Sequence, residues 1–148
     1  MPKSRPVGDA DYRRLLALRT GLRRFLRWSE EQAASSSLTP SQHQLLLAIR
    51  GHSGSEPPTI GDVAESLLLR HHSAVELVDR TEEAGLVRRS RDAADHRVVR
   101  LSLTARGARV LAALSERHLE ELARLARSIG PLLAGLDEPA LEAARSGV

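Results

Sequence analysis

The chain of 148 residues contains no cysteine and only one phenylalanine, one tryptophan and one tyrosine. The absence of cysteine excludes disulfide bonds, thiolate metal sites and thiol-based redox sensing. Because aromatic residues are scarce, Leu, Ala and Val must fill the core, and the abundance of Leu and Ala favours helices over sheets. No apolar run approaches the ~18 residues that a membrane span needs, and the first residues lack the apolar stretch of a signal peptide. We therefore expect one compact, cytoplasmic domain that binds no membrane.

Lysine is also nearly missing, since Lys3 is the only one, and arginine carries the positive charge. The formal net charge is only +3, so its placement is more informative than its size. Between residues 70 and 109 nine arginines stand against six acidic residues, whereas the two signs balance in the rest of the chain. An arginine surplus in one segment suits binding to nucleic acid, because the guanidinium group pairs with phosphate and with the edge of guanine.

Apolar residues recur at helical spacing over most of the chain and alternate only in one short stretch. The spacing predicts helices over residues 9–34, 40–50, 60–67 and 71–84, a hairpin with strands over 86–89 and 99–103, a long helix after Thr104, and a short final helix over 138–145. Thr39, Thr59 and Thr104 should cap the helices that follow them, and Gly85 should end its helix in the left-handed conformation. Gly130-Pro131 should bend or stop the long helix.

Two of these helices have a distinct apolar side. In the helix over 71–84 the side that should face the core carries Ala74, Leu77, Val78 and Thr81. The long last helix carries a stripe at alternating three- and four-residue steps, formed by Leu111, Leu114, His118, Leu122, Leu125, Ile129 and Leu132. Such a stripe can pack against another helix or against a second subunit.

The order helix, helix, short turn, helix, hairpin, long helix is that of a winged helix-turn-helix. The segment TIGDVAESLLLRHHSAVELVDRTEEAGLVRRSRDAADHRVVRLSLTARG, with its Asp-x-Arg near the hairpin tip, resembles the MarR family of regulators in order and spacing. The resemblance covers roughly residues 38–133. It implies a mainly α fold with a small β-hairpin wing, in which 1–34 is an N-terminal dimerisation helix, 35–107 is the DNA-binding region and 108–148 holds the C-terminal dimerisation helices.

The resemblance assigns DNA contacts to two places. The recognition helix maps onto 71–84, so its exposed start supplies the candidates Arg70, His71, His72, Ser73, Val75 and Glu76. The Asp-x-Arg corresponds to Asp95 and Arg97, where the Asp holds an arginine that reaches DNA. Arg88, Arg89 and Arg91 at the base of the hairpin are candidates for neutralising phosphate. The alternative is that Glu76 and these wing charges are only solvated surface groups.

The sequence departs from the family pattern before the recognition helix. Leu68-Leu69-Arg70 stands where many relatives have a glycine and a serine-like cap. Arg70 cannot cap a helix as serine does, so the start of that helix is expected to differ.

Many family members release DNA when a small, often phenolic or amphipathic molecule fills a cleft between the dimerisation and DNA-binding helices. On that resemblance, Arg24, Trp28, Gln42 and His43 are the candidate effector residues, although Trp28 can equally be a packing residue. A metal role for His118 with Glu121 or Glu31 is the minor alternative, because a histidine on an apolar stripe is more often a packed residue. We expect no metal and no other cofactor.

The sequence offers neither a nucleophile with its base nor a glycine loop for phosphate, so we expect no enzyme activity. The predicted function is a sequence-specific double-stranded DNA-binding regulator, acting as a homodimeric repressor on a pseudo-palindromic operator. The alternatives are a winged-helix adaptor that does not bind DNA and a metal-responsive regulator.

Overall fold

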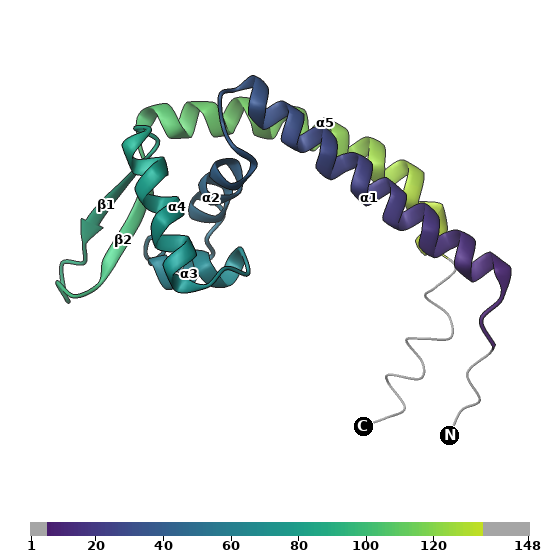
Figure 1. Ribbon diagram of the computed structural model, residues 1–148, viewed down its shortest axis with the longest axis horizontal. Coiled ribbons are helices and arrows are strands. Elements are labelled where there is room, and N and C mark those ends of the chain that lie inside the picture. Colours follow the sequence, from purple (N-terminus) through teal and green to yellow (C-terminus); the bar gives the residue numbers. More distant parts are fainter. Residues whose placement is uncertain (1–5, 135–148) are drawn as a thin grey trace. The chain divides into compact units, whose positions relative to one another are not determined.

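The computed structural model describes residues 6–134 and contains five helices and one hairpin in that range (Figure 1). The elements are α1 (Asp9–Ser35), α2 (Pro40–Arg50), α3 (Ile60–Ser66), α4 (His71–Glu83), β1 (Val87–Arg91), β2 (Val99–Leu103) and α5 (Ala105–Leu133). This order confirms the winged helix-turn-helix with long first and last helices. The short helix expected over 138–145 lies outside the described residues.

The chain divides into two compact units. The central unit is residues 30–116, and the terminal unit has residues 6–29 and 117–134 as its described parts. Each of α1 and α5 therefore contributes residues to both units. Within the described range, no helix combines the length and the apolar character that crossing a membrane requires.

The core of the central unit lies among α2, α3, α4 and the hairpin. Its fully buried side chains include Leu45, Leu46, Val63, Val78 and Leu101. The inward side predicted for the fourth helix is confirmed, because Ala74, Leu77, Val78 and Thr81 are its buried residues. The hydroxyl of Thr81 is satisfied within the helix, since it donates to the carbonyl of Leu77 at 2.7 Å.

Threonines begin three of the helices, as their sequence positions predict. Thr39 and Gln42 form a reciprocal capping box at α2, and Thr59 and Asp62 form another at α3. Each box satisfies backbone N–H groups that a helix start leaves without partners. The backbone N–H of Thr59, which donates to the carboxylate of Asp62 at 2.9 Å, is the main cause that lowers the pKa of Asp62; burial opposes it, and the side-chain bond with Thr59 adds to it.

The hairpin β1–β2 is the wing (residues 87–103), and residues 92–98 are called the wing tip. The strands are antiparallel, with Val87 opposite Leu103 and Arg91 opposite Val99. The predicted first strand was too short, because Ser90 and Arg91 also pair across the hairpin. A third segment borders β2: Leu101 donates its N–H to the Pro58 carbonyl at 2.8 Å, and Thr59 forms a bridge with Arg100.

The start of α5 is fixed against the turn between α4 and the wing. Thr104 caps α5, accepting from the Gly107 N–H at 3.0 Å, and its hydroxyl donates to the Gly85 carbonyl at 2.7 Å. Gly85 has a φ of 76°, which confirms the left-handed end predicted for the preceding helix. At Gly107 a Cβ atom would lie 2.1 Å from the carbonyl oxygen of Leu86, so only glycine allows this approach.

In the terminal unit, α1 and α5 lie side by side and run in opposite directions (Figure 1). Gly21 allows them to approach, because a Cβ there would meet Leu125 at 3.2 Å and Ile129 at 3.4 Å. The expectation that Gly130-Pro131 stops the helix is corrected, since α5 continues to Leu133. Pro131 lacks only its own N–H, and the Ala134 N–H still donates to the Gly130 carbonyl at 3.0 Å, so the last turn persists.

Candidate nucleic-acid interface

The first turn of α4 exposes most of the side chains predicted to contact DNA. Arg70, His71, His72 and Glu76 are exposed, whereas Ser73 and Val75 are half-buried. The buried residues of the helix lie on the other side and attach it to α2 and α3. The structure therefore brings all six candidates to one end of one helix, as the sequence predicts.

The turn before α4 is unusual in two respects. Leu68 has a φ of 55°, a conformation that favours glycine, and its side chain is 93% exposed. Arg70 occupies the N-cap position but makes no side-chain capping bond. Both observations agree with the departure found in the sequence, and the first N–H groups of α4 have no side-chain cap from the residue that precedes it.

At the wing tip, Asp95 holds Arg97 in a bidentate ion pair. Nε of Arg97 donates to Oδ1 at 3.1 Å and Nη2 donates to Oδ2 at 3.2 Å, while its backbone N–H also donates to Oδ1 at 3.1 Å. These bonds, the side-chain one first, lower the pKa of Asp95. The Arg97 side chain is nevertheless 91% exposed. The pair thus fixes the arginine's direction while leaving the guanidinium accessible, as the Asp-x-Arg interpretation requires.

A second carboxylate, that of Asp92, stabilises the backbone of the wing tip. Oδ2 of Asp92 accepts the N–H of Ala94 at 3.0 Å and that of Asp95 at 2.9 Å. Its Oδ1 accepts from Nε of Arg100 at 3.1 Å. The backbone bond from Asp95 and then the Arg100 bond lower the pKa of Asp92. Asp92 and Arg100 were not among the predicted site residues, although an aspartate two and three residues before the amides it caps is a known turn pattern.

The three candidate arginines of β1 have different surroundings. Arg88 is exposed, and no hydrogen bond or ion pair of its side chain occurs within residues 6–134. Nη1 of Arg91 donates to the His96 carbonyl at 2.9 Å and closes the wing tip. Arg89 is 25% exposed and binds two carboxylates of α4: its Nη1 donates to Glu82 at 2.8 Å, and its Nη2 donates to Asp79. Arg89 thus joins the wing to α4, and phosphate contact by these arginines stays a prediction.

The four candidate effector residues belong to two different units. In the terminal unit Arg24 is exposed, and the Trp28 ring lies 4.8 Å from that of His118 and 6.1 Å from that of Phe25. In the central unit Gln42 completes the capping box of α2, and His43 is buried. The cleft that these residues would line stays a prediction.

The histidine considered as a metal ligand is a packed residue. The ring Nε2 of His118 is hydrogen-bonded to the Ser29 hydroxyl at 2.7 Å, and Phe25 meets the ring edge-on at 6.1 Å. In residues 6–134, no three His, Asp or Glu side chains lie together in an arrangement that could hold a metal ion.

Comparisons with known proteins agree with this geometry. A sequence model described as MarR family matches residues 36–98, which include α2, α3, α4, β1 and the wing tip. The structure is similar to AbsC, a MarR family transcriptional regulator from Streptomyces coelicolor, with a TM-score of 0.69 and 19% identity over 97% of this chain and 99% of that one.

Two further solved structures resemble the chain. One is a MarR family protein from Bacillus stearothermophilus (TM-score 0.66, 26% identity, 93% of this chain and 92% of that one). The other is a mutant of MarR from E. coli complexed with operator DNA (TM-score 0.66, 20% identity, 80% of this chain and 84% of that one). A search of curated protein sequences finds no significant match.

Proposed function

We propose that the chain is a sequence-specific DNA-binding transcriptional regulator of the MarR family, because residues 36–98 match the MarR family model and the fold is that of the MarR winged-helix regulators. The observation that carries the proposal is the pairing of two exposed surfaces in the central unit: the first turn of α4 and Arg97 at the wing tip. A helix start of this kind fits the major groove, and a projecting arginine fits the neighbouring minor groove. The E. coli relative, which is complexed with operator DNA, supports DNA as the partner.

The chain acts as a homodimer through its terminal unit in this proposal. None of the described residues in that unit is buried, although both helices carry large apolar side chains. The exposed ones are Val7, Tyr12, Leu15, Leu16, Leu22, Leu26, Leu119, Leu122 and Leu133. A pair of helices that buries so little has no core of its own, and a second copy would cover this surface. Two recognition helices would then read a pseudo-palindrome with half-sites about one turn, ~10 bp, apart.

Repression is the proposed outcome of binding, with release by a small effector as its regulation. Both follow from the family resemblance and from operator binding by a relative. No catalytic step is proposed for the chain, because the exposed groups on α4 and at the wing tip suit binding of phosphate and base edges.

The test is DNA binding as a function of salt concentration, using the DNA upstream of the chain's own gene and a shuffled sequence of equal length. Arg97→Ala should weaken binding and reduce the slope of log K against log salt by about 1.8, because a dimer loses two positive charges that displace counterions from DNA. Arg19→Ala removes the same charge from an exposed position of α1 and should leave the slope unchanged. Equal binding to both DNAs at every salt concentration would refute a sequence-specific regulator, and no binding to either DNA would favour an adaptor.

A further inference from the structure

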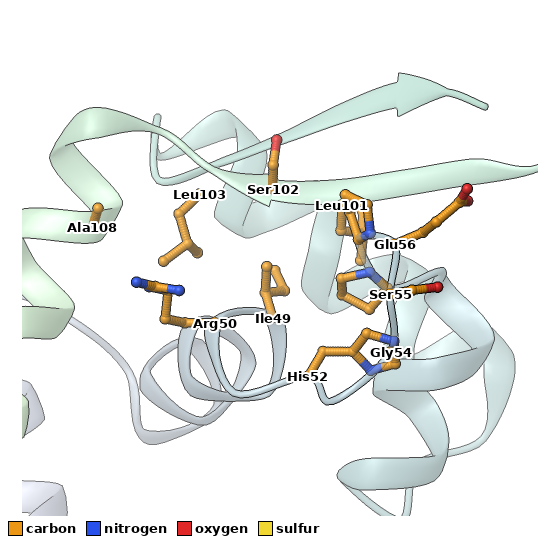
Figure 2. Close-up of a pocket in the computed structure, with 12 residues that line it drawn as sticks. Ile49, Arg50, His52, Gly54, Ser55, Glu56, Leu101, Ser102, Leu103 and Ala108 are labelled. Atoms are coloured by element: carbon orange, nitrogen blue, oxygen red, sulfur yellow. The ribbon is translucent and has the colours of Figure 1, made fainter. Parts of the chain in front are cut away.

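The hollow among the end of α2, the loop 51–58 and β2 offers a ligand little apolar surface, although apolar residues line it (Figure 2). Ile49, Pro58 and Leu101 form its apolar wall, and all three are buried in the core of the central unit. The apolar surface that this unit leaves open to a partner lies elsewhere, at the turn between α3 and α4.

Leu68 is the apolar side chain of the central unit that is most open to solvent. It is 93% exposed, against 53% for Leu47 and 38% for Leu69, the other large apolar side chains of residues 30–116 that are exposed. The preceding Leu67 is half-buried and packs against the core. Folding therefore covers one leucine of this turn and leaves the next one uncovered.

The backbone holds Leu68 in a fixed position. The N–H of Leu69 donates to the carbonyl of Ala64 at 2.8 Å, and the N–H of Leu68 donates to the carbonyl of Glu65 at 3.2 Å. These two bonds form a Schellman motif, whose left-handed position is usually occupied by glycine. Here it is occupied by Leu68, with a φ of 55°. A leucine at this position destabilises the turn, and its exposed side chain adds no packing that would offset the strain.

Leu68 lies next to a positive charge that has no partner within the described part of the chain. The side chain of Arg70 is exposed and takes part in no hydrogen bond or ion pair among residues 6–134. Because successive Cα atoms are 3.8 Å apart, the Cα atoms of Leu68 and Arg70 are separated by at most about 7.6 Å. A phosphate and the adjoining sugar of a DNA strand present a matching pair of surfaces, an anion and an apolar C–H face.

We propose that Leu68 packs on the deoxyribose beside the phosphate that Arg70 neutralises, and that it strengthens DNA binding without reading the base sequence. Leu68 precedes the helix that enters the major groove, so it meets the strand backbone at the edge of the groove. Because the Schellman motif already fixes the leucine backbone, little further ordering is needed when DNA binds. The inference rests on the proposed DNA binding and extends the contact surface, from the first turn of α4, to a residue outside that helix.

The test compares Leu68→Ala and Leu68→Gly in binding to the DNA upstream of the chain's own gene and to its shuffled counterpart. Both variants should lower the affinity for both DNAs about tenfold, because each dimer loses two partly buried leucines. The salt slope should stay at its wild-type value, whereas Arg70→Ala should reduce it by about 1.8. Leu68→Met keeps an apolar side chain of similar size and should bind as the wild type does. The control Leu47→Ala, on the exposed side of α2, should also leave DNA binding unchanged.

Urea unfolding separates the contact from the conformation of the turn. Leu68→Gly removes the strain as well as the side chain, so its urea midpoint should lie about 0.3 M above that of Leu68→Ala. A more stable variant that binds DNA more weakly is not expected of a leucine with a purely structural role. Normal DNA binding by Leu68→Ala would overturn the inference, and a loss confined to the upstream DNA would overturn the sugar contact in favour of a base contact. A wild-type chain that binds neither DNA would refute the proposed function as well, whereas unaffected Leu68 variants of a chain that binds DNA refute this inference alone.

Discussion

Arg89 and its neighbour Arg88 allow the role of a wing arginine to be measured. Both were candidates for neutralising phosphate, and they lie at adjacent positions of β1. Arg89 is 25% exposed and bound to Glu82 and Asp79 of α4, whereas Arg88 is exposed and unbound within residues 6–134. Changing each arginine to methionine removes the same charge and keeps the apolar stem. The two variants therefore differ only in whether bonds to α4 are lost.

The expected cost for Arg89→Met follows from its two ionic bonds. The side chains of Glu82 and Asp79 are 38% and 59% exposed, so water can replace part of the hydrogen bonds that their carboxylates lose with the guanidinium. Exposed ion pairs contribute up to ~1 kcal/mol each, and the half-buried arginine places this case at the upper end. We expect the free energy of unfolding to fall by about 1–2 kcal/mol, against less than ~0.5 kcal/mol for Arg88→Met.

Urea unfolding at equal protein concentration measures these differences, and the m-value should stay constant. In a background that carries Asp79→Asn and Glu82→Gln, the cost of Arg89→Met should largely disappear, since its partners are already neutral. In DNA binding, Arg88→Met should reduce the salt slope and Arg89→Met should not. The reasoning fails if the two variants are equally stable, or if Arg89→Met lowers the slope as much as Arg88→Met does.

Three further predictions concern the dimer, the start of α5 and the wing tip. Leu122→Asp should dissociate the dimer in sedimentation experiments, because a carboxylate would be buried at the proposed interface. The control Leu47→Asp, on the exposed side of α2, should stay dimeric. A dimeric Leu122→Asp would contradict the proposed interface. Gly107→Ala places a methyl group 2.1 Å from a backbone oxygen and should lower the free energy of unfolding in urea by more than ~3 kcal/mol. The control Gly61→Ala in α3 meets nothing nearer than 3.6 Å and should raise it by ~0.5–1 kcal/mol. Equal stabilities of the two variants would refute the close approach at Gly107. The lowered pKa of Asp92 means that its ionised form stabilises the fold, fully above the unfolded pKa near 3.9, and that this contribution is lost as pH falls through the lower folded pKa. The stability difference between wild type and Asp92→Asn should therefore shrink below about pH 4, and a difference that stays constant with pH would show that the charge of Asp92 does not matter.

Much of the structure of the central unit could be predicted, because the residues that determine it lie near one another in the sequence. Threonine caps, Gly85 and the buried side of α4 depend on residues that are near one another in sequence, and the structure confirms all of them. The continuation of α5 past Pro131 was not predicted, because a proline near a helix end removes few bonds and its effect depends on what remains.

The contacts of the wing arginines show which features could not be predicted from neighbouring residues. The bidentate pair of Asp95 and Arg97 joins residues two apart and was anticipated from the resemblance. The partners of Arg89 lie seven and ten residues away, and Arg100 reaches residues more than forty positions earlier. Sequence spacing cannot tell a free arginine from one that is bound by carboxylates from another element, so a charge surplus overestimates the number of phosphate contacts.

Two features of the turn before α4 each lower the stability of the fold. A leucine with positive φ costs on the order of 1 kcal/mol, and a helix start without a side-chain cap costs about as much again. Glycine at Leu68 and serine at Arg70 would relieve both, and neither position is packed in the core. Features that lower the stability of a fold are often found where the surface has a function. Their position immediately before His71 and His72 therefore supports the proposal that Arg70 and the first turn of α4 meet DNA, because an arginine there supplies a positive charge for phosphate, which a capping serine does not.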